Sequence, residues 1–124
     1  MQAAAVARDW AALTACFTDD FVNHASPFQG AEGLSKTLQA IARDLELEEH
    51  VVHDTVAEGD RVVQRVSLRG KHIGSSMPVL AGVPAQGHDF QWEFIHIWRI
   101  DSGLIAEHWA CRDDLGLRVQ LGAP

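Results

Sequence analysis

The chain has 124 residues, of which nearly half are hydrophobic and about a fifth are charged, a composition that argues against a disordered protein. Seventeen acidic residues against ten basic ones give a net charge of -7, which opposes binding to nucleic acid. No apolar run approaches the roughly 20 residues that a membrane span needs, and the N-terminus lacks the features of a secretion signal. We therefore expect one cytoplasmic domain over residues 1–124, without a membrane or nucleic-acid partner.

Two stretches of the N-terminal half carry hydrophobic residues at spacings of three and four, the pattern of one helix face. The first, ending before Thr18, consists of Val6, Trp10, Leu13 and Phe17. The second consists of Leu34, Leu38, Ile41 and Leu45. Residues 21–30 lie between the two predicted helices and contain a proline and a glycine, so we expect them to be irregular and to present His24 and Phe28.

From residue 48 onward hydrophobic residues alternate with polar ones, as in strands. The predicted strands are residues 48–57, 61–69, 88–100 and 104–113, joined as two hairpins. A short helix is expected over residues 115–121, and we interpret the loop 74–87, with its apolar Met77, as a partial lid. The elements predict an α+β domain in which a curved antiparallel sheet forms a cone and the N-terminal helices pack on its concave face.

The strand 88–100 places a row of large side chains on one face. They are Phe90, Trp92, Phe94, His96, Trp98 and Ile100. Two short helices do not need so many for cover, so we expect one end of the row to line a cavity for a hydrophobic small molecule. Ile95 and Ile97 lie on the opposite face, and an antiparallel sheet that is apolar on both faces needs cover on both. We therefore predict a homodimer through the outer face; scattered surface isoleucines are the alternative.

Seven histidines are many for a chain of this length, and His96 stands out among them. It is the one ionisable group in the row, so if it is buried it needs a hydrogen-bond partner. Polar residues that could converge on it are His24, His72, His108, Arg112 and Asp113. The alternative is a core histidine with a structural role only.

Other motifs are weak or absent. His50 and His53 have the H-x-x-H spacing, but residues i and i+3 of a strand point to opposite faces, so we expect no metal site. Cys16 and Cys111 are isolated, which is typical of buried free thiols. The sequence has no glycine-rich phosphate loop and no G-x-S-x-G motif. It also has no tyrosine, so no tyrosine hydroxyl can bind an oxyanion.

Several short motifs follow one another from about Phe17 to the end of the chain. They include Phe21-Val22-Asn23-His24, Glu58-Gly59-Asp60-Arg61-Val62, Gly70-Lys71-His72-Ile73-Gly74, His96-Ile97-Trp98-Arg99-Ile100 and Gly103-Leu104-Ile105-Ala106-Glu107-His108-Trp109. With them the sequence resembles the SnoaL-like polyketide cyclases, members of the superfamily named after nuclear transport factor 2. The resemblance implies an intramolecular aldol closure that uses a histidine and an aspartate on neighbouring strands.

By this resemblance His96 matches the histidine of the family, whereas Ala110 occupies the position of the aspartate and cannot transfer a proton. The ending from His108 to Gly116 looks more like SnoaL-like relatives associated with the hydroxylation of polyketide rings. If the last strand is regular, His108, Ala110 and Arg112 share the pocket face.

We therefore expect an enzyme that acts on a hydrophobic, polyketide-type metabolite by acid/base chemistry, with neither metal nor cofactor. The expected catalytic residues are His96, which transfers the proton, His108, which binds an oxygen together with Arg112, and Asp113, which orients one of them. The expected substrate-binding residues are His24, Phe28, His72, Met77, Trp92, Phe94, Trp98 and Arg112. The alternatives are a hydroxylase component that works with a reductase or flavin source, and a non-catalytic ligand-binding or dimerisation module.

Overall fold

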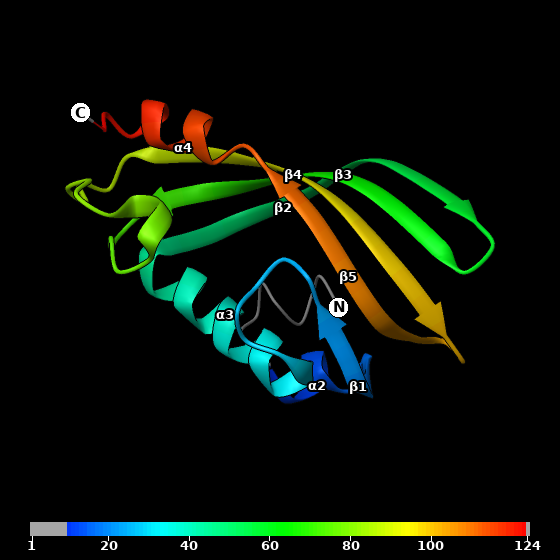
Figure 1. Cartoon of the computed structure of the whole chain (residues 1–124). Helices are drawn as coiled ribbons and strands as arrows, with labels where there is room; N and C mark the ends of the chain where they lie inside the picture. Colours follow the sequence, from blue (N-terminus) through cyan, green and yellow to red (C-terminus); the bar gives the residue numbers. More distant parts are fainter. Residues whose placement is uncertain (1–9, 124) are drawn as a thin grey trace.

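The computed structural model describes residues 10–123, which form three α-helices and one five-stranded sheet (Figure 1). The helices are α2 (Trp10–Thr14), α3 (Gly30–Asp44) and α4 (Asp114–Gln120), with a 3-10 turn η1 (Pro78–Leu80). The strands are β1 (Phe17–Asn23), β2 (Leu45–Glu58), β3 (Arg61–His72), β4 (Asp89–Asp101) and β5 (Leu104–Arg112). No helix within these residues is long and apolar enough to cross a membrane.

The strand order is β1-β5-β4-β3-β2, and the sheet stays open, with β1 and β2 at its edges. β2 to β5 pair antiparallel through two hairpins, as predicted, whereas β1 pairs parallel to β5 and makes the sheet mixed. α3 packs against α2, β1 and β2 below the curved sheet, while α4 lies against β4 at the other end (Figure 1). The predicted α+β class, a curved sheet with helices on its concave face, is confirmed.

The N-terminal segment differs from the prediction. The helix ends at Thr14 rather than at residue 17, and Phe17 begins a strand instead; Val6 lies outside the described residues. Phe17 and Phe21 are both buried, and a spacing of four residues brings side chains to one face in a strand as well as in a helix. The backbone decides between the two, because Ile105 N–H donates to the carbonyl oxygen of Cys16 at 2.9 Å, joining the segment to β5.

The loop between β3 and β4, interpreted from the sequence as a partial lid, covers part of the core and not the cavity described below. Leu80 and Val83 are buried against α4 and the inner face of the sheet. The carboxylate of Asp44, itself buried at the end of α3, accepts hydrogen bonds from the backbone N–H groups of Ser76 at 2.9 Å and Met77 at 2.7 Å. The loop is thereby tied to α3, away from the cavity described below.

Buried hydrophobic residues form two core clusters, one at each end of the sheet. The first includes Leu80, Phe90, Trp92, Phe94 and Leu117 and lies against α4 and η1. The second includes Leu13, Phe17, Phe21, Leu34 and Trp98 and lies between α2, α3 and β1. The aromatic row of β4 therefore runs from one cluster into the other, and Leu38 of α3 packs against both.

The outer face of the sheet has little cover within the described residues. Ile95 is 48% exposed. Cys111, its partner in the β4–β5 register, is exposed rather than buried as expected, because it points to the same outer face.

Candidate functional site

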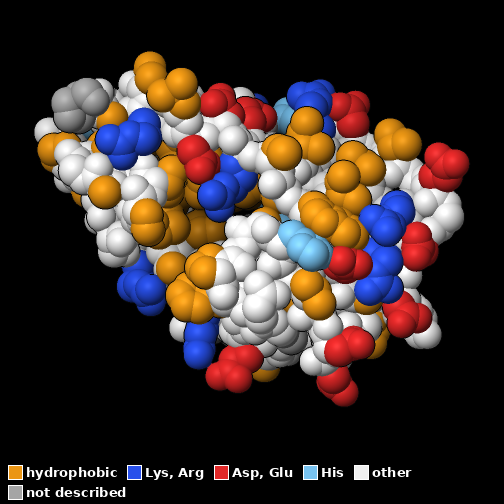
Figure 2. All heavy atoms as spheres, in the orientation of Figure 1, with side chains coloured by type: hydrophobic (Ala, Val, Ile, Leu, Met, Phe, Trp, Pro, Cys, Tyr) orange, Lys and Arg blue, Asp and Glu red, His pale blue; other side chains and the backbone are white. Residues whose placement is uncertain are grey.

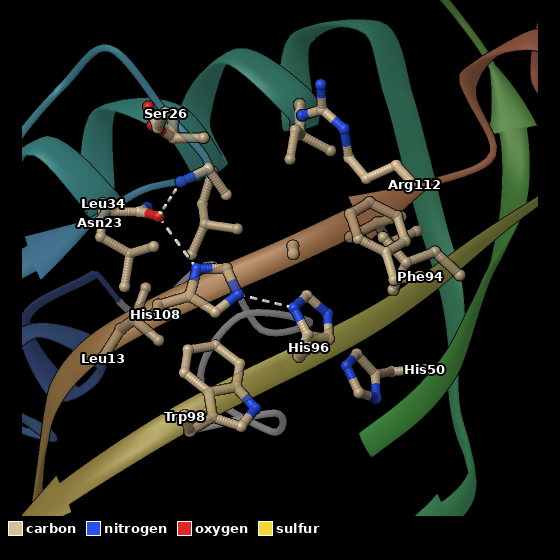
Figure 3. A pocket seen from close by; sticks show the side chains of 17 residues that line it. Leu13, Asn23, Ser26, Leu34, His50, Phe94, His96, Trp98, His108 and Arg112 are labelled. Carbon is tan, nitrogen blue, oxygen red and sulfur yellow. Dashed lines mark hydrogen bonds between the residues drawn. The ribbon is translucent and has the colours of Figure 1, made fainter. Parts of the chain in front are cut away.

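A cavity of about 120 Å³ lies between α3 and the inner face of the sheet, where the two core clusters meet. Its apolar wall includes Leu13, Leu34, Leu38, Ile41, Leu47, Leu68, Phe94 and Trp98, and its polar wall includes Asn23, Ser26, Thr37, His50, His96, His108 and Arg112. Figure 2 shows a hollow bordered by hydrophobic side chains, and Figure 3 shows the cavity wall from close by. An apolar cavity with a few convergent polar groups is typical of small-molecule sites.

Three polar side chains from adjacent strands form a hydrogen-bonded chain along this wall (Figure 3). His96 Nδ1 of β4 lies 2.7 Å from His108 Nε2 of β5, and His108 Nδ1 lies 2.9 Å from Asn23 Oδ1 of β1. The strand register produces this order, because Asn23 pairs with His108 across the parallel edge. Ala110 lies directly opposite His96, so the position at which the resemblance implies an aspartate adjoins this histidine.

The protonation of both imidazoles follows from the orientation of the Asn23 amide. The backbone N–H of Ala25 donates to Asn23 Oδ1 at 2.9 Å, and a backbone donor fixes which amide atom is the oxygen. That oxygen must also accept from His108, so the His108 proton lies on Nδ1 and its Nε2 accepts from His96 Nδ1–H. A neutral imidazole carries one proton, so Nε2 of His96 keeps its lone pair.

Burial keeps both imidazoles neutral at pH 7. It lowers the pKa of His96 to about 4, with a further contribution from the nearby His50. It lowers the pKa of His108 to about 3, with further contributions from His96 and then His24. The hydrogen bonds between the two imidazoles require both rings to be neutral, and burial keeps them neutral by lowering their pKa values.

Aromatic rings hold His96 in place. Phe94 stacks against its ring at a centroid distance of 5.2 Å, and Trp98 stacks against it at 5.0 Å. Trp98 also stacks on His108 at 4.1 Å. Such stacking restricts the rotation of both imidazoles, so the Nε2 lone pair of His96 has a defined direction.

Five of the residues expected in the site line the cavity. They are Phe94, His96, Trp98, His108 and Arg112. His108 differs from the expectation in one respect, since both of its nitrogens are already hydrogen-bonded and neither is left to bind a carbonyl oxygen. Its position suits it to orient His96 instead.

The other six expected residues lie outside the cavity wall, three of them at the ends of elements. Phe28 is 49% exposed on the surface before α3, and Met77 lies beside it in a separate surface groove. His72 is buried at the far end of β3, where its Nε2 lies 3.0 Å from the hydroxyl of Ser75. Met77 and His72 lie away from the cavity because the loop after β3 packs against the first core cluster.

Two more expected residues, His24 and Trp92, are engaged in other contacts. His24 stacks on Trp109 at a centroid distance of 5.0 Å and pairs with a carboxylate of β5. Trp92 is buried below α4, where its Nε1–H donates to Asp114 Oδ1 at 3.1 Å. Neither side chain faces the cavity.

Asp113, the last of the six, has a structural role at the start of α4. Its carboxylate caps this helix by accepting from the N–H of Gly116 at 2.9 Å. Arg112 contacts Asp114 rather than Asp113, with its guanidinium donating to Asp114 Oδ2 at 3.2 Å. The expected orienting function of Asp113 therefore has no counterpart in these contacts.

Sequence reasoning missed four polar residues of the cavity wall, which are Asn23, Ser26, Thr37 and His50. Asn23 belongs to a motif that was noted, but its place beside His108 depends on β1, which was not predicted. In the sequence, His50 stands out only as one half of an H-x-x-H pair. The predicted opposite orientation holds: His50 faces the cavity, and His53 lies 2.6 Å from the hydroxyl of Ser67. The available signal for His50 was Val52, which lies two residues further along the strand and packs against the first core cluster. Because residues i and i+2 of a strand share a face, this indicates that His50 points inward as well.

Comparisons with known proteins agree with this architecture. The family model described as "SnoaL-like polyketide cyclase" matches residues 1–121. Aklanonic acid methyl ester cyclase DnrD of Streptomyces peucetius is 32% identical over 104 residues, which are 83% of this chain and 69% of that protein. The chain is similar to solved structures as well. TsrD from Streptomyces laurentii has a TM-score of 0.85 and 32% identity, over 98% of this chain and 89% of that chain.

AclR from Streptomyces galilaeus, a candidate hydroxylase, has a TM-score of 0.81 and 24% identity, over 98% of this chain and 79% of that chain. At that identity the likeness concerns the fold alone. The match of the family model over almost the whole chain, together with the identity to DnrD, is sufficient for assignment. The chain belongs to the SnoaL-like polyketide cyclase family.

Proposed function

We propose that this protein catalyses proton transfer in a hydrophobic, polyketide-type compound without a cofactor, and that the reaction is a ring closure of the aldol type. The observation that carries the proposal is a neutral His96 in an apolar cavity. The hydrogen bonds from His96 to His108 and from His108 to Asn23 leave the Nε2 lone pair of His96 free. An imidazole held in this way is suited to act as a general base. A cytoplasmic location remains a prediction.

In the proposed reaction Nε2 of His96 removes a proton from a carbon next to a carbonyl group, and the enolate carbon attacks a second carbonyl of the same molecule. A C–C bond forms, the second carbonyl becomes an alkoxide, and the imidazolium returns the proton to it. The product is an isomer of the substrate, and no oxidant or reductant is consumed. In the apolar cavity the enolate and the imidazolium attract each other, which offsets the low basicity that burial gives His96.

One observation favours a second candidate function. Ala110 lies opposite His96, where the resemblance expects an aspartate, so a second acid/base group is missing at that position. A ligand-binding module that has the pocket but does not catalyse the closure would have this arrangement.

A turnover assay distinguishes the candidates. The probe is aklanonic acid methyl ester, the compound in the name of DnrD, incubated with the protein and followed by chromatography and mass spectrometry. We expect a product of unchanged mass, as ring closure requires. A product that gains one oxygen atom contradicts the cyclase proposal and indicates a hydroxylase, while binding without conversion supports the non-catalytic module.

We also propose that a second copy of the chain covers the outer face of the sheet. Ile95 pairs with Cys111 and Ile97 with Trp109 in the β4–β5 register, so these four side chains lie together on that face. An isologous dimer would bury the same patch on both copies.

The Ile97→Lys variant is expected to dissociate this dimer, because two buried ammonium groups would face each other across the two-fold axis. Val119→Lys is the matched control, since Val119 is 69% exposed on α4, away from the patch. Light scattering at micromolar concentration measures both variants. A monomeric unmodified protein would remove the basis of the proposal.

A further inference from the structure

Arg112 is the one charged side chain among the described residues that line the cavity. The other ionisable groups of this wall are His50, His96 and His108. Burial lowers the pKa of each histidine below 6.5, so all three are neutral at pH 7. A guanidinium, in contrast, is always protonated in a protein and binds carboxylates. The charge of a ligand therefore matters at this part of the wall.

Arg112 lies at the mouth of the cavity. It is accessible to solvent over 37% of its side chain, and it lines both the cavity and the groove next to it that contains Cys111 and Asp113. The other described residues that line the cavity are buried or half-buried. Figure 3 shows the side chain of Arg112 extending from β5 toward α3. A ligand group that reaches the guanidinium therefore stays near solvent while the rest of the ligand occupies the cavity.

The guanidinium has hydrogen-bond donors to spare for a ligand. It carries five N–H groups in one plane. Among the described residues one polar contact engages it, the hydrogen bond from Nη2 to Asp114 Oδ2 at 3.2 Å. Asp114 is held in turn by Trp92, whose Nε1–H donates to its other oxygen at 3.1 Å, and the guanidinium lies 5.7 Å from the centroid of the Trp92 ring. These contacts hold the guanidinium in place and leave most of its donors for a ligand.

The strand register sets the separation between this charge and His96. Ala110 pairs with His96, and Arg112 pairs with Phe94, so Arg112 lies two residues further along the same face of β5. Two residues of a strand span about 7 Å. A ring system can bridge this separation, so one molecule can contact the guanidinium and His96 together.

We propose that Arg112 binds a carboxylate of the ligand at the mouth of the cavity, and that the substrate is a hydrophobic ring compound with a free acid group. Arginine and carboxylate form charge-assisted hydrogen bonds, which are stronger than those to a neutral ester or amide. The net charge of -7 repels anions, so a preference for an acid has to come from a local group. The compound in the name of DnrD is a methyl ester, which lacks this charge. A reaction at His96 rests on the proposed function, whereas the acid-binding site can be tested by binding alone.

Calorimetric binding of two probes of similar shape tests this site at pH 7. The probes are 2-naphthoic acid, which is charged, and 2-naphthamide, which is neutral. We expect the unmodified protein to bind the acid about tenfold more tightly than the amide. Arg112→Gln is expected to lose this preference, and Arg112→Lys to keep part of it. Arg69→Gln is the matched control and should keep the full preference, because Arg69 donates to Gln91 outside the cavity wall.

The Ala110→Leu variant tests whether the rings of the probes lie in the cavity. Ala110 lines the cavity opposite His96 and is absent from the wall of the neighbouring groove, so a larger side chain there fills the cavity alone. We expect this variant to bind both probes at least about tenfold more weakly. Denaturant midpoints are measured for every variant, so that a loss of folding is not taken for a loss of binding. If Ala110→Leu does not fold, the two Arg112 variants decide.

Three results would overturn the proposal: equal affinities for the two probes, a preference for the acid that Arg112→Gln keeps, or acid binding that a folded Ala110→Leu protein leaves unchanged. A preference that Arg112→Gln loses, in a protein that converts no substrate, would support the acid-binding site while contradicting the proposed catalysis. Turnover of aklanonic acid methyl ester without any preference for the acid would support the catalysis and overturn this site.

Discussion

The His96→Phe variant is expected to lose turnover of aklanonic acid methyl ester by about 10²–10⁴-fold, the range that a general base contributes. Phenylalanine keeps a flat ring between Phe94 and Trp98 but has no lone pair to accept a proton. Folding should be preserved, because the position is already surrounded by aromatic rings. The measurement is the rate of isomer formation, together with the denaturant midpoint at pH 7.

His88→Phe is the matched control for this variant. His88 is exposed, its Nε2 lies 2.9 Å from Gln86 Oε1, and it lies outside the cavity wall. We expect it to keep full turnover. A His96→Phe protein that is folded and as active as the unmodified one would contradict the assignment of His96 as the base.

Lowering the pH from 7 to 4.5 is expected to destabilise the fold by about 5 kcal/mol. In the unfolded chain histidines take up protons near pH 6.5, whereas in the folded state burial lowers the pKa of His96 to about 4 and that of His108 to about 3. Between these values the unfolded state binds more protons than the folded state. The stability that is fully present above pH 6.5 is therefore lost progressively as the pH falls.

Urea midpoints at pH 7, 6, 5 and 4.5 measure this effect in a window above the ordinary titration range of most carboxylates, about pH 4. The double variant His96→Phe, His108→Leu provides the control, since it lacks both buried imidazoles. We expect its midpoint to change much less over the same window. An unmodified protein with equal midpoints at pH 7 and 5 would show that these histidines are not held neutral by burial.

Much of the sheet could be predicted from the sequence because its signals are local. Alternation placed Phe94, His96 and Trp98 on one face of β4, and the short turn before β5 indicated the hairpin. A one-residue register shift between Arg99 and Ile100 then brings Ala110, rather than Trp109, opposite His96. The hairpin needs no information from distant parts of the chain. The cavity lies beside the middle of the row, at Phe94, His96 and Trp98, rather than at one end as expected, and alternation alone could not show this.

The rest of the site depends on contacts between distant residues. Asn23 and His108 are 85 positions apart, and only the parallel pairing of β1 with β5 joins them. The spacing of Phe17 and Phe21 suits a helix as well as a strand, so the sequence pattern could not decide between them. The apolar residues of the loop after β3 indicated that it covers something, but the buried carboxylate of Asp44 determines what it covers.

Asn23 and His108 together fix the proton of His96 on Nδ1 and leave Nε2 free at neutral pH. Side-chain ¹⁵N NMR of the histidines, recorded from pH 7.5 to 4, tests this directly, because protonated and unprotonated ring nitrogens have different shifts. We expect His96 and His108 to show a protonated Nδ1 and an unprotonated Nε2 at pH 7, and to remain neutral at pH 5. A His96 that carries its proton on Nε2, or that titrates near pH 6.5, would contradict the account.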